Sequence, residues 1–212
     1  QAQDLLRRLD AVDSNGAATP AGRRMAALGT HPRLAHMIDR GAALGLGALA
    51  CDIAALLGER DPLRLPPGQR DPDLRHRLDV LRGGHPPPGA DVDSRALAQV
   101  RRTAQLLQRR LPRGPTAQAS DPDRDAGLLL AFAYPDRIGL SRGEAETGRY
   151  LLANGRGAVL PGPASLGRSE LIVAADIDAG EREARVHLGA PLDRATLERH
   201  FAARIAPQDE VA

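Results

Sequence analysis

Apolar residues recur at intervals of three and four along residues 5–133, the spacing that gathers them on one face of an α-helix. The core-facing side predicted for residues 32–42 holds Leu34, Met37, Ile38, Gly41 and Ala42. The small residues on this side predict a close helix crossing. The opposite side, which is expected to point outward, holds Arg33, His36 and Arg40. Residues 47–58 are apolar on almost every side, which predicts a helix at the centre of a bundle.

Short polar signals mark where these helices begin and end. Thr19 and Pro20 suit the N-cap and the first helical position, and Gly29 suits a left-handed residue after the last turn. Further helix starts are predicted at Pro32, at Asp71-Pro72, at Asp91 or Asp93 (a helix that ends near Leu111), and at Asp121-Pro122.

The pattern changes near residue 134, where short apolar runs separated by turn residues replace the helical spacing. The dipeptide Asn154-Gly155 is a strong hairpin signal. A helix is expected again after residue 193. The chain therefore predicts an α+β fold, with a helical bundle followed by a small barrel or sandwich. The strand candidates are residues 137–142, 149–160, 170–177 and 184–190.

Composition removes several classes of function. The 212 residues include no lysine, so the 29 basic residues are all arginine, which excludes a Walker A loop and Schiff-base chemistry. Aromatic residues make up only 2%, which disfavours recognition of nucleic acid by base stacking. Cys51 is the single cysteine, so it is expected to be a small buried residue rather than part of a disulfide or thiolate cluster.

No arrangement of residues resembles an active site. The six histidines have no metal-ligand spacing, no nucleophile elbow is present, and several carboxylates occupy helix-capping positions. We therefore assign no catalytic, cofactor-binding or metal-binding residue and expect no ATPase activity from these residues alone. We expect no signal peptide, and the longest apolar run, residues 42–57, is too short to span a bilayer. A cytoplasmic protein that does not bind membranes is expected.

The distribution of charge points to one candidate surface. No acidic residue occurs between Ser94 and Ser120, whereas six arginines do. Three of them repeat every seven residues and so stay close to one helix face: Arg95, Arg102 and Arg109. A face with only positive charge suits contacts with phosphates. A face docked on an acidic neighbouring domain would give the same pattern, and the sequence leaves both interpretations open.

The β-rich part holds a second group of candidate nucleic-acid contacts. Four arginines flank its strands and turns, and the turn at residues 154–157 exposes backbone N–H groups beside a guanidinium. These candidates are Arg137, Arg142, Arg149, Asn154 and Arg156. A plain hairpin turn explains Asn154-Gly155 equally well.

Two stretches resemble DEAH/RHA-type ATP-dependent helicases. Residues 5–38, "LLRRLDAVDSNGAATPAGRRMAALGTHPRLAHMI", are similar to the start of the helicase-associated region of that family. Residues 129–143, "LLAFAYPDRIGLSRG", and 150–160, "YLLANGRGAVL", look more specifically like one bacterial member. The stretches occur in the family's order with compatible spacing, and the resemblance covers nearly the whole chain.

The resemblance implies a division of the chain and a set of partners. Residues 1–18 would be the tail of a winged-helix-like segment, residues 19–133 a helicase-associated, ratchet-like bundle, and residues 134–212 an OB-like domain. In the family, ATP and Mg²⁺ bind between two RecA-like motor domains, which this sequence lacks. The accessory domains pack on that motor and close a channel around single-stranded RNA. In such a region the basic residues near the His31-Pro32 joint would set the packing of the bundle, or face the channel or motor.

Two functions from different classes follow. The first is an accessory region of a helicase that guides single-stranded RNA, and possibly DNA, and packs on motor domains of the same chain. The second is a stand-alone basic module that docks an acidic protein partner. Because a closed OB-type barrel needs five strands and only four candidates are found, we expect an incomplete barrel with an exposed edge and a tendency to self-associate.

Overall fold

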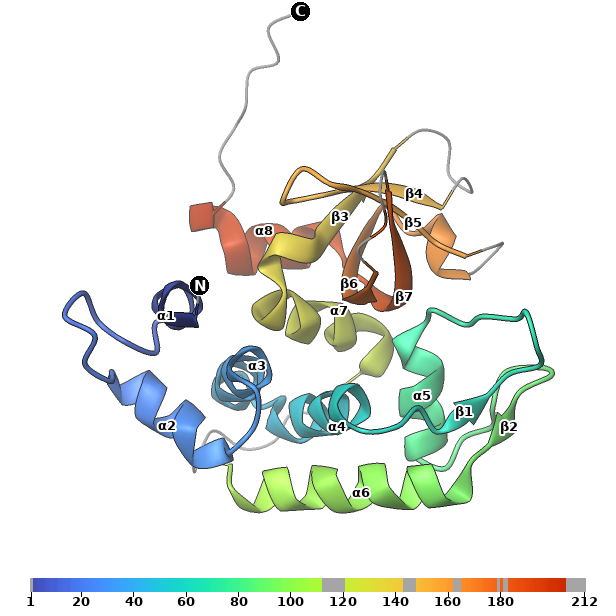
Figure 1. Cartoon of the computed structure of the whole chain (residues 1–212), viewed down its shortest axis with the longest axis horizontal. Helices are drawn as coiled ribbons and strands as arrows, with labels where there is room; N and C mark the ends of the chain where they lie inside the picture. The colour runs from blue at the N-terminus through green and yellow to red at the C-terminus, as the bar shows by residue number, and fades with distance from the viewer. Residues whose placement is uncertain are drawn as a thin grey trace, which may run out of the picture.

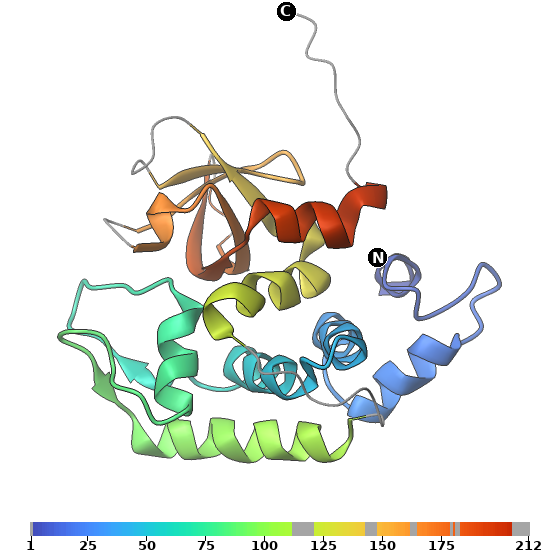
Figure 2. The ribbon, with the colours of Figure 1, turned by 180° about the vertical axis from the view of Figure 1, so that it is seen from behind.

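The computed structural model shows a layer of helices below a small β-barrel, with one helix between them (Figure 1). Figure 2 shows the same arrangement from behind. The structure describes residues 2–111, 121–142, 148–161, 165–178, 180 and 183–204. Among these residues, no helix combines the length and the apolar character that crossing a bilayer requires.

The described helices follow the predicted order. The α-helices are α1 (Ala2–Arg8), α2 (Pro20–Leu28), α3 (Pro32–Ala43), α4 (Gly47–Gly58), α5 (Leu74–Leu81), α6 (Ser94–Arg109), α7 (Pro122–Ala133) and α8 (Arg194–Phe201). Three short 3₁₀ turns are η1 (Pro135–Arg137), η2 (Ser165–Arg168) and η3 (Ala202–Arg204). Two-residue strands β1 (Leu63–Arg64) and β2 (Asp91–Val92) pair antiparallel beside α5 and α6.

Capping side chains fix the predicted helix starts. The Thr19 hydroxyl accepts a hydrogen bond of 2.9 Å from the Gly22 N–H, with Pro20 in the first turn, and Gly29 has φ 65° after the last turn of α2. His31 caps α3 because its Nδ1 accepts from the Arg33 N–H at 3.3 Å. The α5 start lies slightly later than expected, since Asp73 rather than Asp71 is its N-cap.

The helix crossing predicted at Gly41 is confirmed, but the prediction for the other side of α3 is partly wrong. A Cβ on Gly41 would lie 2.8 Å from a Leu129 methyl group of α7 and 3.0 Å from the Ala50 Cβ of α4. His36, expected to point outward, is buried, and its Nδ1 lies 3.0 Å from the Phe132 carbonyl oxygen of α7. The polar side of α3 therefore also packs against α7, because α7 crosses it.

The remaining strands form a closed barrel. They are β3 (Ile138–Ser141), β4 (Arg149–Leu152), β5 (Gly157–Val159), β6 (Leu171–Ile177) and β7 (Glu183–Pro191), in the order β3-β4-β5-β7-β6, and β6 pairs back to β3. All pairs are antiparallel except β5 and β7, which are parallel. The expected incomplete barrel with an exposed edge is therefore wrong, and with it the reason given for self-association.

The prediction of one strand over residues 149–160 is wrong. The Asn154-Gly155 turn splits this range into the antiparallel pair β4 and β5. Gly155 has φ 82° and its N–H donates to the Leu152 carbonyl, so the hairpin signal was correct. The fifth strand comes from this hairpin.

Strand β6 separates two cores. Its residues Ile172 and Ala174 point into the barrel with Tyr150, Leu152 and Val186. The residues that alternate with them join the helical core instead: Leu171, Val173 and Ala175. Because both of its faces are buried, β6 joins the barrel to the helical layer.

Close backbone contact places α7 on the barrel. A Cβ added to Gly127 would lie 1.9 Å from the Pro191 carbonyl oxygen at the end of β7. We predict that Gly127→Ala lowers the free energy of unfolding by roughly 2 kcal/mol or more, because backbone must move. Chemical denaturation measures this.

Gly58→Ala provides a matched control. Gly58 is also helical, at the end of α4, but a Cβ there meets no atom within 4 Å. This variant should be neutral or up to about 1 kcal/mol more stable, because alanine favours the helix. Equal effects of the two substitutions would contradict the proposed role of Gly127.

Candidate functional site

The predicted arginine face is present on α6, which lies along α4 at the edge of the molecule furthest from the barrel (Figure 1). The apolar seam of α6 is buried and consists of Leu97, Val100, Ala104 and Leu107. Hydrogen bonds also hold this helix on α4: the Thr103 hydroxyl donates to Glu59 just after α4 at 2.6 Å, and Gln108 Nε2 donates to Asp52 at 3.2 Å. The seam and these bonds fix which side of α6 faces outward.

Arg101 of α6 and Arg110, the residue after this helix, both bind backbone carbonyls of other helices. The Arg101 guanidinium donates to the Leu81 carbonyl oxygen at 3.2 Å, and that of Arg110, which follows the helix, donates to the Leu28 carbonyl oxygen at 3.0 Å. Leu81 and Leu28 are the last residues of α5 and α2. The C-terminus of a helix carries partial negative charge and unpaired carbonyls, so both arginines stabilise helix ends.

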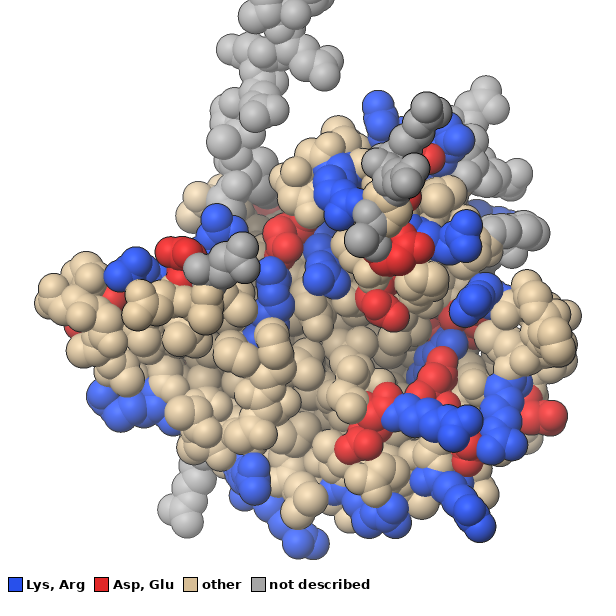
Figure 3. Space-filling view, viewed as in Figure 1, with Lys and Arg blue, Asp and Glu red and all other residues tan. Residues whose placement is uncertain are grey.

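The three arginines that repeat every seven residues lie on the outer side of α6. Arg95, Arg102 and Arg109 are exposed, and none of them pairs with a carboxylate among the described residues. Arg102 donates to the Gln99 side-chain oxygen at 2.6 Å. Leu106, 53% exposed, lies on the same side of the helix. Figure 3 shows basic side chains along the lower edge, where α6 runs.

The structure places the second group of predicted residues on the barrel, on the opposite side of the helical layer from α6 (Figures 1 and 2). The Arg137 guanidinium donates to the Ala175 carbonyl oxygen at 2.7 Å, and that of Arg156 donates to the Gly180 carbonyl oxygen at 3.1 Å. The Asn154 side-chain oxygen accepts from the Arg156 N–H at 3.0 Å, as in a plain turn. The two predicted groups do not form one site.

The other two barrel arginines lie where β3 and β4 pair. The Arg142 N–H donates to the Arg149 carbonyl oxygen and so continues the ladder between these strands. The Arg149 side chain is 61% exposed, with a Glu183 carboxylate oxygen 3.8 Å away. Both arginines are exposed.

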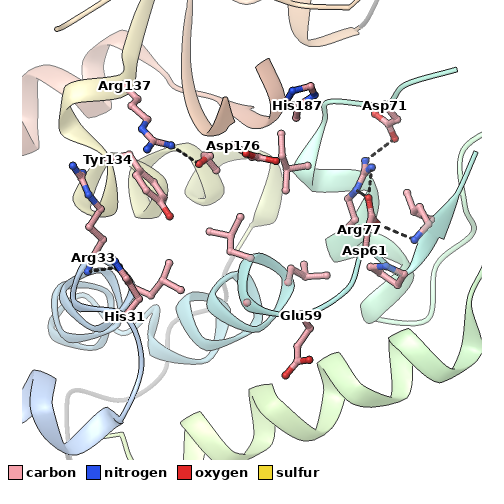
Figure 4. A pocket seen from close by; sticks show the side chains of 18 of the residues that line it. His31, Arg33, Glu59, Asp61, Asp71, Arg77, Tyr134, Arg137, Asp176 and His187 are labelled. Atoms are coloured by element: carbon pink, nitrogen blue, oxygen red, sulfur yellow. Dashed lines mark hydrogen bonds and ion pairs between the residues drawn. The ribbon is translucent and has the colours of Figure 1, made fainter. Parts of the chain in front are cut away.

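Sequence reasoning missed a cleft of about 1090 Å³ between the helical layer and the barrel. Figure 4 shows the side chains that line it, from the start of α3, the end of α4, the segment before α5, η1 and strands β6 and β7. Of the predicted site residues, only Arg137 lines it. The lining combines leucines with both signs of charge, including Arg33, Arg77, Glu59, Asp61 and Asp176.

Arg33 at the start of α3 contacts residues 133–136 on the other side of this cleft. Its guanidinium donates to Asp136 at 2.6 Å and to the Ala133 carbonyl oxygen at 2.9 Å. It also lies 5.4 Å from the centre of the Tyr134 ring, and the Arg137 guanidinium lies 4.7 Å from the same ring. Burial raises the pKa of Tyr134 above its ordinary value. Arg33 thus joins α3 to η1, in agreement with a structural role for the His-Pro joint.

The cleft has no strong preference for one charge. Arg77 is buried between the carboxylates of Asp61 (2.9 Å) and Asp71 (3.0 Å), and Asp71 also bonds His76 at 2.7 Å, which raises the pKa of that imidazole. Arg77 and His76 thus have carboxylate partners within the fold. No group of three or more potential metal ligands is found within the described part of the chain.

No family model matches the sequence. The chain is 35% identical over 173 residues to the ATP-dependent RNA helicase HrpB of Escherichia coli K12, which covers 82% of this chain and 18% of that protein. The crystal structure of E. coli DExH-box NTPase HrpB superposes with a TM-score of 0.70 at 32% identity, over 95% of this chain and 22% of that one. A second structure, of the E. coli DEAH/RHA helicase HrpB, gives a TM-score of 0.64 at 32% identity, over 90% of this chain and 21% of that one.

This chain is related to a segment of HrpB, a DEAH/RHA helicase. It spans about a fifth of the length of these HrpB relatives. The resemblance noted from residues 5–38, 129–143 and 150–160 is thereby confirmed.

The contact that holds α6 in this HrpB-like fold is predicted to depend on pH. Burial raises the pKa of Asp52 to about 6. The Asp52 carboxyl group therefore holds its proton more tightly in the folded chain than in the unfolded chain. The stability that Asp52 contributes is then greatest below about pH 4 and is lost as the pH rises through about 6. Asn at this position keeps the acceptor for Gln108 and carries no charge.

We therefore predict that Asp52→Asn raises the free energy of unfolding at pH 8 by about 1–3 kcal/mol, with a gain that shrinks towards pH 4. Denaturant titrations at several pH values measure this difference. A gain that is constant from pH 4 to pH 8 would show that the charge of Asp52 is not its cause.

Proposed function

We propose that this chain is an accessory region of an HrpB-type ATP-dependent RNA helicase, and that it guides single-stranded RNA in the cytoplasm. The similarity to HrpB over most of this chain supports the assignment. ATP and Mg²⁺ would bind to RecA-like motor domains outside this chain, on which it would pack. The barrel has five strands closed with one parallel pair, which supports an OB-type domain.

The observation that carries the RNA-guiding role is the single-sign face of α6. Residues seven apart on a helix are separated by about 10.5 Å along its axis, so Arg95, Arg102 and Arg109 present a row about 21 Å long. Within the part of the chain that the structure describes, no carboxylate pairs with these guanidiniums, which favours contacts with phosphates. The proposed contact is with the RNA backbone and is independent of sequence.

The aromatic residues support this mode of binding. The chain has four of them, and Phe132, Phe201 and Tyr150 are buried while Tyr134 lies against two guanidiniums. The bases of a single strand therefore have no exposed aromatic ring to stack on, although stacking is the usual source of affinity beyond charge. Affinity would come from phosphate contacts and should depend steeply on salt.

We predict that changing Arg95, Arg102 and Arg109 together to Gln weakens binding to single-stranded RNA about equally for poly-U and mixed sequences. The slope of log affinity against log salt should fall in magnitude by about 2, because each lost phosphate contact removes roughly 0.7. Fluorescence anisotropy with labelled 20-mers at several salt concentrations measures both quantities.

The matched control changes Arg142, Arg149 and Arg156 to Gln, which removes the same charge from the barrel. This control should alter the slope less than the α6 variant does. If the α6 variant leaves affinity and slope unchanged, the helix faces a protein instead, and the interpretation as a basic module for an acidic partner gains support.

A further inference from the structure

Both asparagines of this chain are followed by glycine, and both lie in exposed turns. Asn15-Gly16 lies in the loop between α1 and α2, at the left edge of Figure 1, and Asn154-Gly155 joins β4 to β5. The two glycines have φ values of 84° and 82°, and a Cβ on either would meet no atom within 4 Å. The same dipeptide thus occurs twice with similar exposure and glycine φ, so its hydrogen bonds decide how the two sites differ.

Asparagine before glycine is chemically prone to deamidation. The glycine backbone nitrogen, after giving its proton to hydroxide, attacks the asparagine Cγ, and no glycine side chain obstructs this approach. The new N–Cγ bond displaces the side-chain nitrogen, which leaves as ammonia, and a succinimide ring remains. Water then opens the ring at either carbonyl and gives aspartate or isoaspartate. The reaction therefore requires an asparagine side chain that can turn its Cγ onto the next backbone nitrogen.

Hydrogen bonds hold Asn154 in its turn. Its side-chain oxygen accepts from the Arg156 N–H at 3.0 Å, and the Gly155 N–H donates to the Leu152 carbonyl oxygen at 2.8 Å. The Leu152 N–H in turn donates to the Arg156 carbonyl oxygen at 2.8 Å, so the ladder of a closed barrel continues into this turn. Attack on the Asn154 Cγ requires that these bonds break first.

The Asn15 turn is built on a different side chain. Asp13 Oδ1 accepts from the Asn15 N–H and from the Ala17 N–H, both at 2.9 Å, and the Asp13 carbonyl oxygen accepts from the Gly16 N–H at 3.1 Å. Among the described residues, no hydrogen bond involves the Asn15 side chain. Helix α1, which precedes the turn, has no fully buried residue, so local opening here costs little.

We infer that Asn15 is a site of spontaneous deamidation in the folded chain, whereas its turn protects Asn154. The modification consumes water and releases ammonia, and it needs no enzyme. This inference goes beyond the proposed function and does not depend on it.

Deamidation changes both the charge and the backbone of the turn. It adds a carboxylate two residues from Asp13, and isoaspartate also adds a methylene group to the backbone. The Asp13 N–H donates to the Ala17 carbonyl oxygen at 2.9 Å and Val12 pairs with Ala18, so a longer turn disturbs the pairing that closes it. Because Thr19 follows directly and caps α2, the modification acts on the connection between α1 and that helix.

The test incubates the full chain in its folded state at neutral pH and follows both asparagines by mass spectrometry. Trypsin cleaves after arginine and releases residues 9–23 and 150–156, so each asparagine lies in a peptide of its own. The same two peptides, incubated after digestion, give the rates without folded structure. The rate at Asn15 should stay within about threefold of its peptide rate, and Asn154 should be slowed at least about fivefold more than Asn15, because its hydrogen bonds must open.

Two variants serve as controls, with circular dichroism to check that each is folded. Gly16→Ala should slow the reaction at Asn15 and leave Asn154 unchanged, because the added methyl group obstructs the attacking nitrogen. Gly58→Ala, at a glycine far from both turns in the sequence, should change neither rate. Equal protection of the two asparagines, stronger protection of Asn15, or an unchanged Asn15 rate in folded Gly16→Ala would each overturn the inference. If Gly16→Ala does not fold, the comparison of the two asparagines within the unaltered chain still decides.

Discussion

The contact between α7 and the edge of the barrel formed by β6 and β7 determines the rest of this structure. Residues 125–133 of α7 are all buried, because α3, α4 and α5 pack on one side of the helix and the barrel packs on the other. Gly127 allows the helix backbone to touch the Pro191 carbonyl, and the alternation of β6 sends Leu171, Val173 and Ala175 towards it. The helical layer also meets the barrel where α5 contacts β7, but among the described elements α7 is the one that packs closely on α3, α4 and α5 and on β6 and β7 together.

Arginine takes several structural roles in this lysine-free chain. Arg24 holds the buried carboxylate of Asp39 with two hydrogen bonds of 2.6 and 2.9 Å, and Arg33 clamps Asp136 in a similar way. Arg101 and Arg110 bind carbonyls at helix ends. A planar guanidinium with five donors suits such sites better than a lysine ammonium does. The number of basic residues therefore overstates the positive charge available to a polyanion. Helix α6 differs because none of Arg95, Arg102 and Arg109 binds a carboxylate or a carbonyl at a helix end among the described residues.

The sequence predicted most of the helical part because its signals are local. Caps such as Thr19 and Asp93, the Gly29 turn and the seam of α6 depend on residues within one or two helical turns. Predictions failed where long-range packing decides. His36 has a polar position on an amphipathic helix, and only the crossing of α7, 96 residues away, makes it a buried partner of Phe132. The cleft was out of reach for the same reason, since its walls come from segments between Leu5 and Leu188.

The barrel illustrates a different limit. Asn154-Gly155 predicts the turn correctly, but the prediction of a single strand over residues 149–160 ignores this turn and so gives one strand too few. Closure itself depends on the pairing of β3 with β6, which no local pattern encodes. The same alternation that closes the barrel also decides which side chains remain outside. Leu140 and Leu151 are exposed because their neighbours Tyr150 and Leu152 point into the barrel, a consequence of strand register that becomes visible only in the folded chain.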